Sequence, residues 1–505
     1  MTNPAVRAVH IAWFRDDLRI ADNPALFAAL EGNDGGTLTI AVYVHDEVSE
    51  NIRPLGSAAR WWLHHGLREL RAQLSELGVP LVLHQGTALL KIPEATEALR
   101  QHFGLNPEDL SVYWNRRYGG GERAVDASLM ELLRGQGATV SSFSATLLHE
   151  PWTVQTQEQR PYKVFTPFHN AAQLIPLRPA LPAPSNAQQA RAPEMPAGEE
   201  LDSWGLLPSR PDWSAGLAAA WTPGEAAAHE RLGVVLQDVA ADYLLGRDRP
   251  GIDGTSRLSP ALRWGHLSPV QVWEALGAVA ATHPEAAEGA RAMMRQLAWR
   301  DFCWNQLYHR PDLGRVNLRT EFNEFDWAWP TGLLPTPASG RPAAKPPTVP
   351  SDAVQGQINA LHEAWCRGET GFPLVDAGMR ELWETGWMHN RVRMVTASLL
   401  VKNLGIHWRA GEAWFWDTLV DADPASNPAN WQWVAGCGAD AAPYFRVFNP
   451  VLQAKKFDAQ GRYRARFGPL LNQEPVVDLK ESRAAALAAY EHMRHSARTG
   501  DAHQP

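Results

Sequence analysis

Over the first 150 residues, short apolar runs alternate with amphipathic stretches. The apolar runs are continuous and rich in β-branched residues, as in strands buried on both faces of a parallel sheet, and they lie at 8–14, 37–44, 79–85 and 110–115. Residues 56–78, between the second and third runs, carry apolar residues at helical spacing. This rhythm predicts an open parallel sheet with right-handed crossovers.

The rest of the chain changes pattern twice. From 177 to 215 it is rich in Pro, Ala and Ser, which is typical of an extended linker. From 224 to 450 the pattern is helical almost throughout, except at 330–352, where many prolines exclude helix and strand and predict a surface insertion. The C-terminal stretch predicts one short helix followed by a polar tail.

At 505 residues the chain is too long for one ordinary core, so at least two domains are expected. The predicted fold is an α/β N-terminal domain, with an open parallel Rossmann-like sheet, followed by an all-α domain. The expected bounds are 1–140 for the α/β domain, 141–223 for the linker, 224–490 for the helical domain and 491–505 for the tail.

Composition and charge exclude several classes of protein. The chain is 45% apolar and 20% charged, as globular proteins are, and it lacks the long uncharged apolar run that a membrane span needs. Its start reaches acidic residues before any run long enough for a signal peptide. The three cysteines are far apart and lack metal-ligand spacing, which indicates a reducing cytoplasm and no metal site. Because the net charge is −8, any nucleic-acid contact should come from a local basic patch.

Polar residues concentrate in two segments near the C-terminus. In the first, residues 387–408, Asn390 and Met394 lie four apart and share one face of a predicted helix, flanked by Arg391 and Arg393.

In the second segment, Asp421 and Asp423 lie two apart and are followed by Asn427, Trp431 and Trp433. Carboxylates, an amide and large aromatic rings in an apolar region predict a pocket for a planar, heteroatom-rich ligand. For either segment alone, the alternative is a Trp-rich helical core with capped helix ends.

A third segment, residues 254–269, predicts the start of a helix. Thr255, Ser256 and Ser259 can cap this helix, with Pro260 in its first turn. Hydroxyls, backbone N–H groups and Arg257 at such an end would form an anion site, and an ordinary cap is the alternative.

Taken together, these segments resemble the FAD-binding half of the DNA photolyase and cryptochrome family. WFRDDLRIADNPAL at 13–26 is similar to the family's opening, and PYKVFTPF at 161–168 to its interdomain segment. The resemblance covers about residues 8–490 and is greatest to class I cyclobutane pyrimidine dimer photolyases.

The resemblance implies a FAD site. Its residues would be Tyr243, Thr255, Ser256, Arg257, Leu258, Ser259, Arg393, Asp421, Asp423 and Asn427. Arg393 would pair with Asp421, since either charge would be costly to bury alone. Asn427 matches the position that faces flavin N5 and favours the reduced flavin.

The resemblance also implies a chain of tryptophans for photoreduction of the flavin. Trp431 and Trp408 match its first two members, and the Pro-rich insertion displaces the third. Trp327 and Trp329 are both candidates for the third position. We take Trp329, with Trp431, Trp408 and Asn427, as the catalytic set.

For the substrate, the resemblance implies UV-damaged DNA. The residues that would contact it are Arg247, Gln296, Trp299, Asn390, Arg391, Met394 and Trp433. Trp299 would stack on the flipped pyrimidines. Gln296 stands where many cyclobutane-dimer photolyases have Glu, and it can donate a hydrogen bond but cannot supply a proton.

An antenna site is implied by YGGGERAVD at 118–126, where Glu122 matches half of the Asn-Glu pair of folate-type photolyases and Gly121 replaces the Asn. Methenyltetrahydrofolate, 8-hydroxy-5-deazaflavin and an empty site all remain open.

The resemblance therefore implies a light-dependent DNA repair lyase. Photoexcited reduced FAD would donate an electron to a flipped-out cyclobutane pyrimidine dimer, which splits, and the electron would return. The alternative is a cryptochrome-type blue-light sensor that does not repair DNA. The enzyme would be a cytoplasmic monomer without membrane contact.

Overall fold

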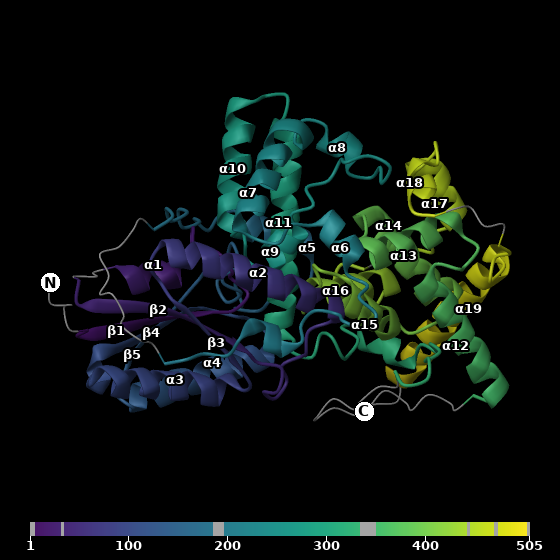
Figure 1. Ribbon diagram of the computed structural model, residues 1–505. Coiled ribbons are helices and arrows are strands. Elements are labelled where there is room, and N and C mark those ends of the chain that lie inside the picture. The colour runs from purple at the N-terminus through teal and green to yellow at the C-terminus, as the bar shows by residue number, and fades with distance from the viewer. Residues whose placement is uncertain are drawn as a thin grey trace. The chain divides into compact units, whose positions relative to one another are not determined.

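The computed structural model describes residues 6–31, 35–184, 196–333, 350–441, 445–468 and 473–501. The chain forms two compact units, each assembled from separate stretches of sequence (Figure 1). The first unit comprises Met1–Val154, Ala172–Ala240 and Ser256–Asp301, and the second comprises Gln155–Ala171, Ala241–Thr255 and Phe302–Pro505.

The first unit contains a five-stranded parallel sheet in the order β3-β2-β1-β4-β5. The strands are β1 (Ala8–Phe14), β2 (Thr37–His45), β3 (Leu81–Gln85), β4 (Leu110–Asn115) and β5 (Thr139–Phe143). The first four confirm the predicted strands. The fifth strand was not predicted, because its sequence, TVSSF, carries two serines in place of an apolar run.

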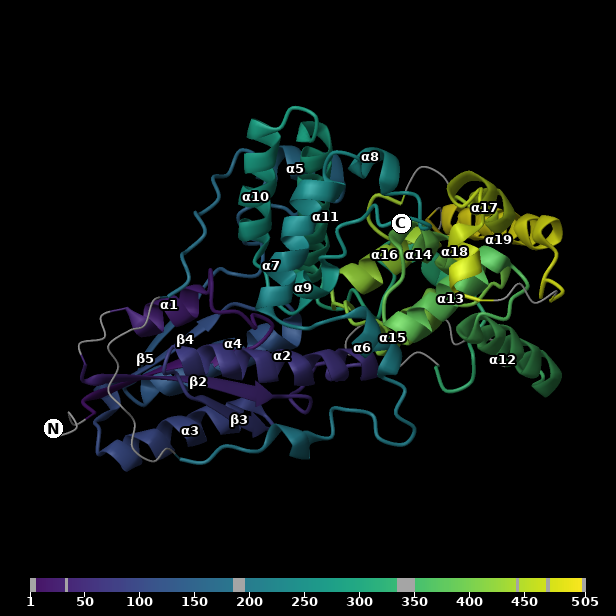
Figure 2. The same ribbon diagram turned by 45° about the horizontal axis from the view of Figure 1, so that its top comes forward.

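Helices cover both faces of this sheet, α1 (Pro24–Leu30) and α2 (Ser57–Glu76) on one face and α3 (Ala88–Phe103) and α4 (Gly120–Gly135) on the other (Figures 1 and 2). The strand order runs outward from β1 in both directions, and right-handed crossovers place the helices of the two directions on opposite faces. The predicted α/β fold is therefore confirmed, with the helix predicted at 56–78 present as α2.

The first unit also contains other helices, besides the four that cover the sheet. These are η1 (Pro107–Asp109), η2 (Leu201–Trp204), α6 (Ala215–Ala220), α7 (Glu225–Val234), the π-helix η3 (Val235–Val239), α9 (Ser259–Arg263), α10 (Pro269–Thr282) and α11 (Ala287–His309), whose residues after Asp301 belong to the second unit.

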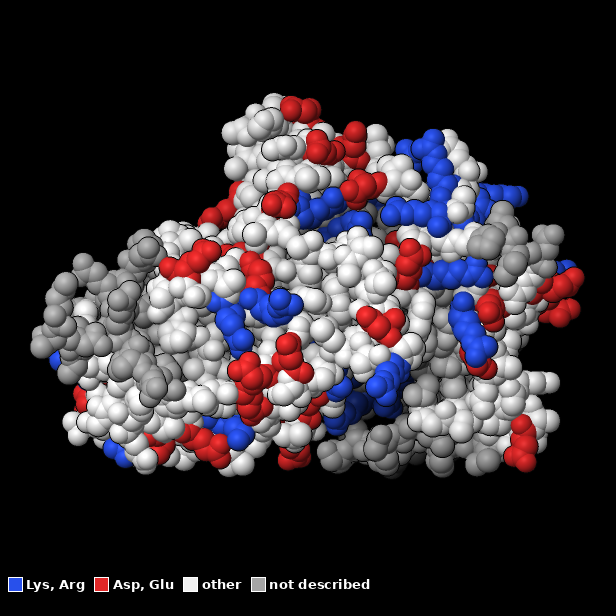
Figure 3. All heavy atoms as spheres, in the orientation of Figure 1, with Lys and Arg blue, Asp and Glu red and all other residues white. Residues whose placement is uncertain are grey.

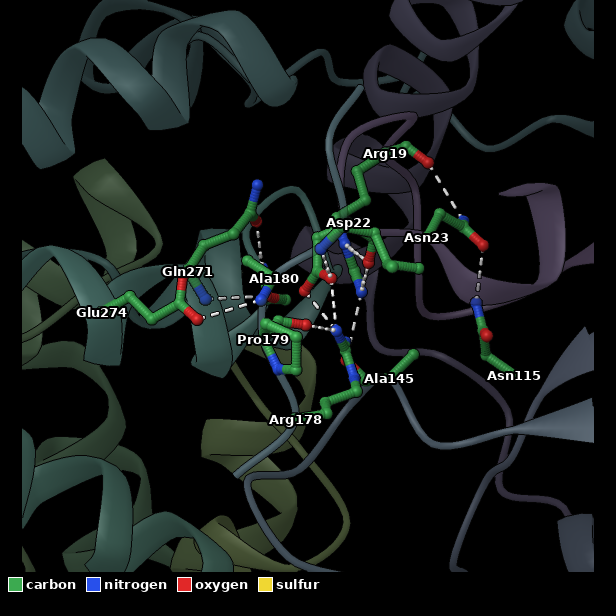
Figure 4. Close-up of polar contacts among 12 residues, drawn as sticks. Arg19, Asp22, Asn23, Asn115, Ala145, Arg178, Pro179, Ala180, Gln271 and Glu274 are labelled. Carbon is green, nitrogen blue, oxygen red and sulfur yellow. Dashed lines mark hydrogen bonds and ion pairs between the residues drawn. The ribbon is translucent and has the colours of Figure 1, made fainter. Parts of the chain in front are cut away.

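The stretch that follows residue 172 is fixed through Asp22 to the loop between β1 and α1 (Figure 4). Asp22 is buried and accepts hydrogen bonds from the Arg178 guanidinium and from the Leu181 backbone N–H, the latter at 2.8 Å. Burial opposes ionisation of Asp22, but these hydrogen bonds outweigh it and hold its pKa below the usual value. The first residues of the Pro-, Ala- and Ser-rich stretch 177–215 are therefore held in place by hydrogen bonds.

The second unit is helical in its described residues, as predicted. Its helices are α5 (Phe165–Ala172), α8 (Tyr243–Gly246), η4 (Thr320–Glu324), α12 (Asp352–Arg367), α13 (Pro373–Thr385), α14 (Asn390–Ser398), the π-helix η5 (Leu399–Asn403), α15 (Trp408–Thr418), α16 (Ser426–Ala435), α17 (Pro450–Phe457), α18 (Arg462–Arg466) and α19 (Leu479–Asp501). Most of the Pro-rich insertion, 334–349, lies outside the described residues. The C-terminal helix, α19, is 23 residues long, so the prediction of a short helix was wrong.

The core of the second unit is built by α13–α16 around Trp365, Val395, Trp408 and Trp431. In the described part of the chain, every helix is too short or too polar to cross a lipid bilayer.

Candidate functional site

The two polar segments predicted near the C-terminus meet in the second unit. Arg393, on α14, donates from Nη2 to Asp421 Oδ2 at 2.8 Å, so the predicted ion pair is present. Arg393 Nε also donates to the carbonyl of Met388 at 2.7 Å, which fixes the direction of the guanidinium. The Asp421 side chain is only 3% exposed, so the pair is desolvated on the carboxylate side.

Asp423 and Asn427 lie at the start of α16. Asp423 Oδ1 accepts from the backbone N–H of Ala425 and of Ser426, which satisfies two free donors of the first turn. Asn427 is buried, and its Nδ2 donates to the backbone carbonyl and to Oε1 of Glu412, at 3.1 and 2.8 Å. Because both protons of the amide are committed to Glu412, Asn427 can offer a ligand only its carbonyl oxygen.

This cluster leaves acceptor atoms for a ligand. Asp421 Oδ1 is buried without a hydrogen-bond partner among the described residues, which is costly unless something else donates to it. Asp423 uses one carboxylate oxygen as a cap, and Asn427 keeps its oxygen. The residues therefore fit a flavin, whose ring edge and hydroxyls carry donors. In the described residues no group of His, Cys, Asp or Glu could hold a metal ion.

The segment expected to bind the pyrophosphate differs from the prediction. The helix α9 begins at Ser259 and has only five residues, and its N-cap is Leu258, whose side chain cannot accept a hydrogen bond. Ser256 Oγ instead accepts from Leu258 N at 3.4 Å, inside the turn. The predicted Ser/Thr cap is therefore wrong, because Arg257 takes a left-handed conformation, with φ 53°, that shifts the helix start. Ser256–Ser259 lie in the first unit, and Thr255 and the buried Tyr243 lie in the second.

The tryptophans expected to carry electrons are packed into α15 and α16. Trp408 is fully buried and donates from Nε1 to Asn317 Oδ1 at 2.8 Å. The Trp431 ring lies against Gly411, one turn after Trp408, where a Cβ would collide with it. Trp431 therefore reaches α15 closely because position 411 has no side chain.

The residues expected to contact the substrate in the second unit lie at the start of α14 and on α16. Asn390 is exposed, whereas Arg391, Met394 and Trp433 are partly buried. Arg391 donates from Nη2 to Asp248 Oδ1 at 2.7 Å and from Nη1 toward Met394 Sδ at 3.7 Å. Asp248 follows Arg247, so the structure brings Arg247 to the start of α14.

A basic surface lies over α17 and α18. Lys and Arg side chains gather there, at the upper right of Figure 3. The exposed members are Lys455 and Lys456 of α17 and Arg462 and Arg466 of α18. A chain with net charge −8 therefore still carries a local basic surface.

Gln296 and Trp299 lie three residues apart on α11, in the first unit, and both are partly buried. The Gln296 amide makes one long contact, from Nε2 to the Ala292 carbonyl at 3.4 Å, so its hydrogen bonds are mostly available to a ligand.

Glu122, expected at an antenna site, lies in the first turn of α4. Burial raises the pKa of its carboxyl group, although the nearby Arg117 opposes the shift. A Cβ at Gly121 would approach the backbone of Asn51 to 2.6 Å, so this glycine makes room for the chain itself.

Sequence reasoning missed Glu412 and Asp248, which orient Asn427 and Arg391. Each pair is separated by many residues, 15 in the first case and 143 in the second, and neither acid belongs to a recognisable local pattern.

Comparison with known proteins bears on both units. The family model described as "DNA photolyase" matches residues 10–185, and the one described as "FAD binding domain of DNA photolyase" matches residues 293–497. A deoxyribodipyrimidine photo-lyase of Agrobacterium fabrum is 44% identical, over 95% of this chain and 97% of that protein. Another, of Escherichia coli, is 33% identical over 96% of this chain and 99% of that protein.

Among solved structures, a bacterial class III photolyase from Agrobacterium tumefaciens superposes with a TM-score of 0.83 at 39% identity, covering 97% of this chain and 98% of that chain.

Proposed function

The chain belongs to the DNA photolyase family, and on that basis we propose that it is a deoxyribodipyrimidine photo-lyase that splits cyclobutane pyrimidine dimers in DNA under blue light. When bound in its reduced form, FAD supplies the light absorption and the electron that opens the cyclobutane ring, and it regains that electron afterwards. The protein's part is to hold cofactor and dimer together and to exclude water.

The observation that carries the proposal is the set of acceptors around the start of α16. The unpartnered Asp421 Oδ1, the second oxygen of Asp423 and the carbonyl of Asn427 would accept hydrogen bonds from the flavin ring and its neighbouring hydroxyls. The carbonyl of Asn427 suits a flavin N5 that carries a hydrogen, so this residue would favour the reduced cofactor. Tyr243 and Thr255, which also belong to the second unit, would contact the cofactor as well.

Each unit carries residues proposed to contact the dimer. In the first unit, Trp299 would stack on a flipped pyrimidine, since an aromatic ring stacks on any base, and Gln296 would hydrogen-bond a base carbonyl. In the second unit, Trp433 offers a further aromatic ring and Asn390 a further amide. Removing the dimer from the duplex costs little at a damaged step, because the lesion already weakens pairing and stacking.

DNA binding would rest on phosphate contacts by Arg247, Arg391 and the basic surface of α17 and α18. Such contacts release counterions, so affinity should fall steeply as the salt concentration rises. We propose that the protein acts as a monomer in the cytoplasm, which is consistent with its three buried, free cysteines.

The sequence motifs suggested class I, but the similar solved structure is described as a class III photolyase, and we propose class III for this chain. For the antenna, the match of Glu122 to half of the Asn-Glu pair of folate-type photolyases supports a chromophore site at the start of α4, without deciding between methenyltetrahydrofolate, 8-hydroxy-5-deazaflavin and an empty site.

The experiment that tests the function compares three oligonucleotides: one with a cyclobutane dimer, one with a (6-4) photoproduct and one undamaged. Each is incubated with the FAD-containing, reduced protein under blue light or in darkness, and the products are separated by chromatography. Restored pyrimidines should appear only from the cyclobutane dimer and only in light. Repair of the (6-4) lesion alone would overturn the assignment of the cyclobutane dimer as substrate. Repair of neither lesion would favour the light-sensor alternative.

A further inference from the structure

Two short segments of the second unit are joined by an isolated parallel bridge between Ala328 and Ile406. Ala328 N donates to the carbonyl of Gly405 at 2.8 Å, and His407 N donates to the carbonyl of Ala328 at 2.9 Å. In an extended segment, residues two apart point to the same side. The bridge therefore directs both Trp327 and Trp329 toward His407.

His407 contacts three tryptophan rings. It stacks on Trp329 with centroids 4.0 Å apart and an interplanar angle of 21°, and it meets Trp327 edge-on at 4.9 Å. Its own neighbour in sequence, Trp408, lies at 5.5 Å and 34°. One imidazole therefore connects the buried Trp408 with both candidates for the end of the tryptophan chain.

The imidazole is held in a defined orientation and charge state. Its Nδ1 accepts from the backbone N–H of Arg409 at 3.1 Å and so caps the start of α15. An accepting Nδ1 carries no proton, so the proton of the neutral ring is on Nε2. Burial, aided by Arg409, holds the pKa of His407 well below its usual value, so the ring adds no charge beside the indoles.

The two candidate tryptophans differ in exposure. Trp327 is 4% exposed, and its Nε1 donates to the carbonyl of Val401 at 3.1 Å. Trp329 is only partly buried, and its carbonyl is held by Gln355 Nε2 at 3.0 Å. Of the two residues, Trp329 is therefore the more accessible to a reductant in solution.

We propose that His407 is a positioning residue that couples Trp408 to Trp329 and thereby makes Trp329 the end of the electron path. This inference rests on the proposed function, and it specifies the path by which electrons reach the flavin during photoreduction. Imidazole is harder to oxidise than indole, so His407 does not itself lose an electron. It fills the space between the two indoles, and electronic coupling falls steeply when such a space is left open.

Each light-driven step would move one electron along the path. With oxidised FAD bound, one electron would leave Trp431 for the flavin, one would leave Trp408 to restore Trp431, and one would leave Trp329 to restore Trp408. A thiol in solution, as its thiolate, then gives one electron to Trp329 and becomes a thiyl radical, which pairs with a second to form a disulfide.

Two variants of His407 separate coupling from helix capping. His407→Asn keeps a side-chain acceptor for Arg409 N but removes the ring, and His407→Phe keeps a ring but removes the acceptor. Photoreduction of bound, oxidised FAD is followed by its absorbance under blue light with added thiol. We expect His407→Asn to slow photoreduction several-fold and His407→Phe to stay close to the wild-type rate.

A slow Phe variant, whether or not the Asn variant is slow, would overturn the proposal, and so would a wild-type rate in the Asn variant. Trp329→Phe and Trp327→Phe form a second matched pair, of which only the former should slow photoreduction; the reverse result would overturn Trp329 as the end of the path. Failure of the inference leaves wild-type photoreduction and dimer repair intact. Failure of the proposed function is instead seen as a wild-type protein that does not repair dimers even after chemical reduction.

Discussion

Single residues around α16 show how polar groups are divided between the fold and the ligand. Asp423 gives one oxygen to the first turn of α16, and Asn427 gives both amide protons to Glu412. What remains for a ligand is an array of acceptors, to which Asp421 adds a buried oxygen without a partner among the described residues. The local structure therefore selects a ligand rich in donors at one edge.

The first prediction concerns Asp423. Asp423→Asn keeps an oxygen that can cap α16, but it replaces the second acceptor with a donor, so FAD affinity should fall. The loss of one acceptor costs about 1–3 kcal/mol, or roughly 5- to 150-fold in Kd. The measurement is the ratio of flavin to protein absorbance after purification, with thermal unfolding as the check on the cap. An Asn variant that retains a full complement of FAD would contradict the assignment.

The second prediction concerns α11. If Gln296 only hydrogen-bonds the dimer, Gln296→Glu should have a small effect on dimer affinity and on the rate of cyclobutane repair. The free energy at stake is that of about one hydrogen bond, roughly 1 kcal/mol. Trp299→Ala should be far worse, because a lost stacking platform costs about 1–3 kcal/mol per base. Both variants are assayed for dimer binding in darkness and for repair in light, at one salt concentration. If neither change alters either quantity, α11 does not take part in dimer binding.

At the scale of elements, the start of α14 carries an arginine that is already engaged. Arg391 is paired with Asp248, and their side chains are 19% and 36% exposed, so the pair contributes little to stability. If Arg391 binds a DNA phosphate, as proposed, the carboxylate of Asp248 competes with that phosphate for the same guanidinium. We expect Asp248 to limit DNA binding that does not depend on damage.

The third prediction follows from that pair. Asp248→Asn should tighten binding to undamaged and damaged DNA alike and make the salt dependence of binding steeper by about one unit of slope. Binding is measured by fluorescence anisotropy over a series of salt concentrations, with Asp253→Asn, in the same loop, as a matched loss of charge. Weaker binding to damaged DNA in the Asp248 variant would mean that Asp248 instead holds Arg391 in its binding orientation.

The elements also show what sequence alone could predict. Continuous apolar runs identified four strands, whereas β5 escaped because TVSSF has no such run. The pairing of Arg393 with Asp421 was predicted because the segments resemble a known family and because buried charges need partners. The prediction of a Ser/Thr cap at α9 was wrong because the amino-acid sequence does not indicate that Arg257 has a positive φ. Contacts such as Asn427–Glu412 depend on helix packing, which single-segment patterns do not contain.

At the scale of the whole molecule, each unit has a buried histidine held neutral by its surroundings. His266 accepts from Trp62 Nε1 at 3.0 Å in the first unit, and His389 accepts from Arg391 N at 3.1 Å in the second. Burial lowers the pKa of each to about 4. Protonation of either ring would break the hydrogen bond that it accepts.

The fourth prediction is a loss of stability in acid. The folded-state pKa of each histidine lies below its value in the unfolded chain, which is roughly 6.5. Between about pH 4 and pH 6.5 the unfolded chain therefore binds more protons than the folded protein. The free energy of unfolding is therefore highest above roughly pH 6.5 and decreases as the pH drops toward 4. Each histidine contributes about 3 kcal/mol to this loss. Urea unfolding at a series of pH values checks it. In His266→Gln the free energy of unfolding should depend less steeply on pH. A plot of unfolding free energy against pH that runs parallel to that of the wild type would contradict the role of His266.

We propose that the protein uses light to split pyrimidine dimers through reduced FAD held at the start of α16. The most direct measurement is the ultraviolet absorbance of UV-irradiated oligo(dT), mixed with the chemically reduced protein, during alternating periods of blue light and darkness. We predict that thymine absorbance rises only in the light periods and that the rise is lost when Asp423→Asn protein without FAD is used. Absorbance that stays flat in light, or that rises equally in darkness, would contradict the account.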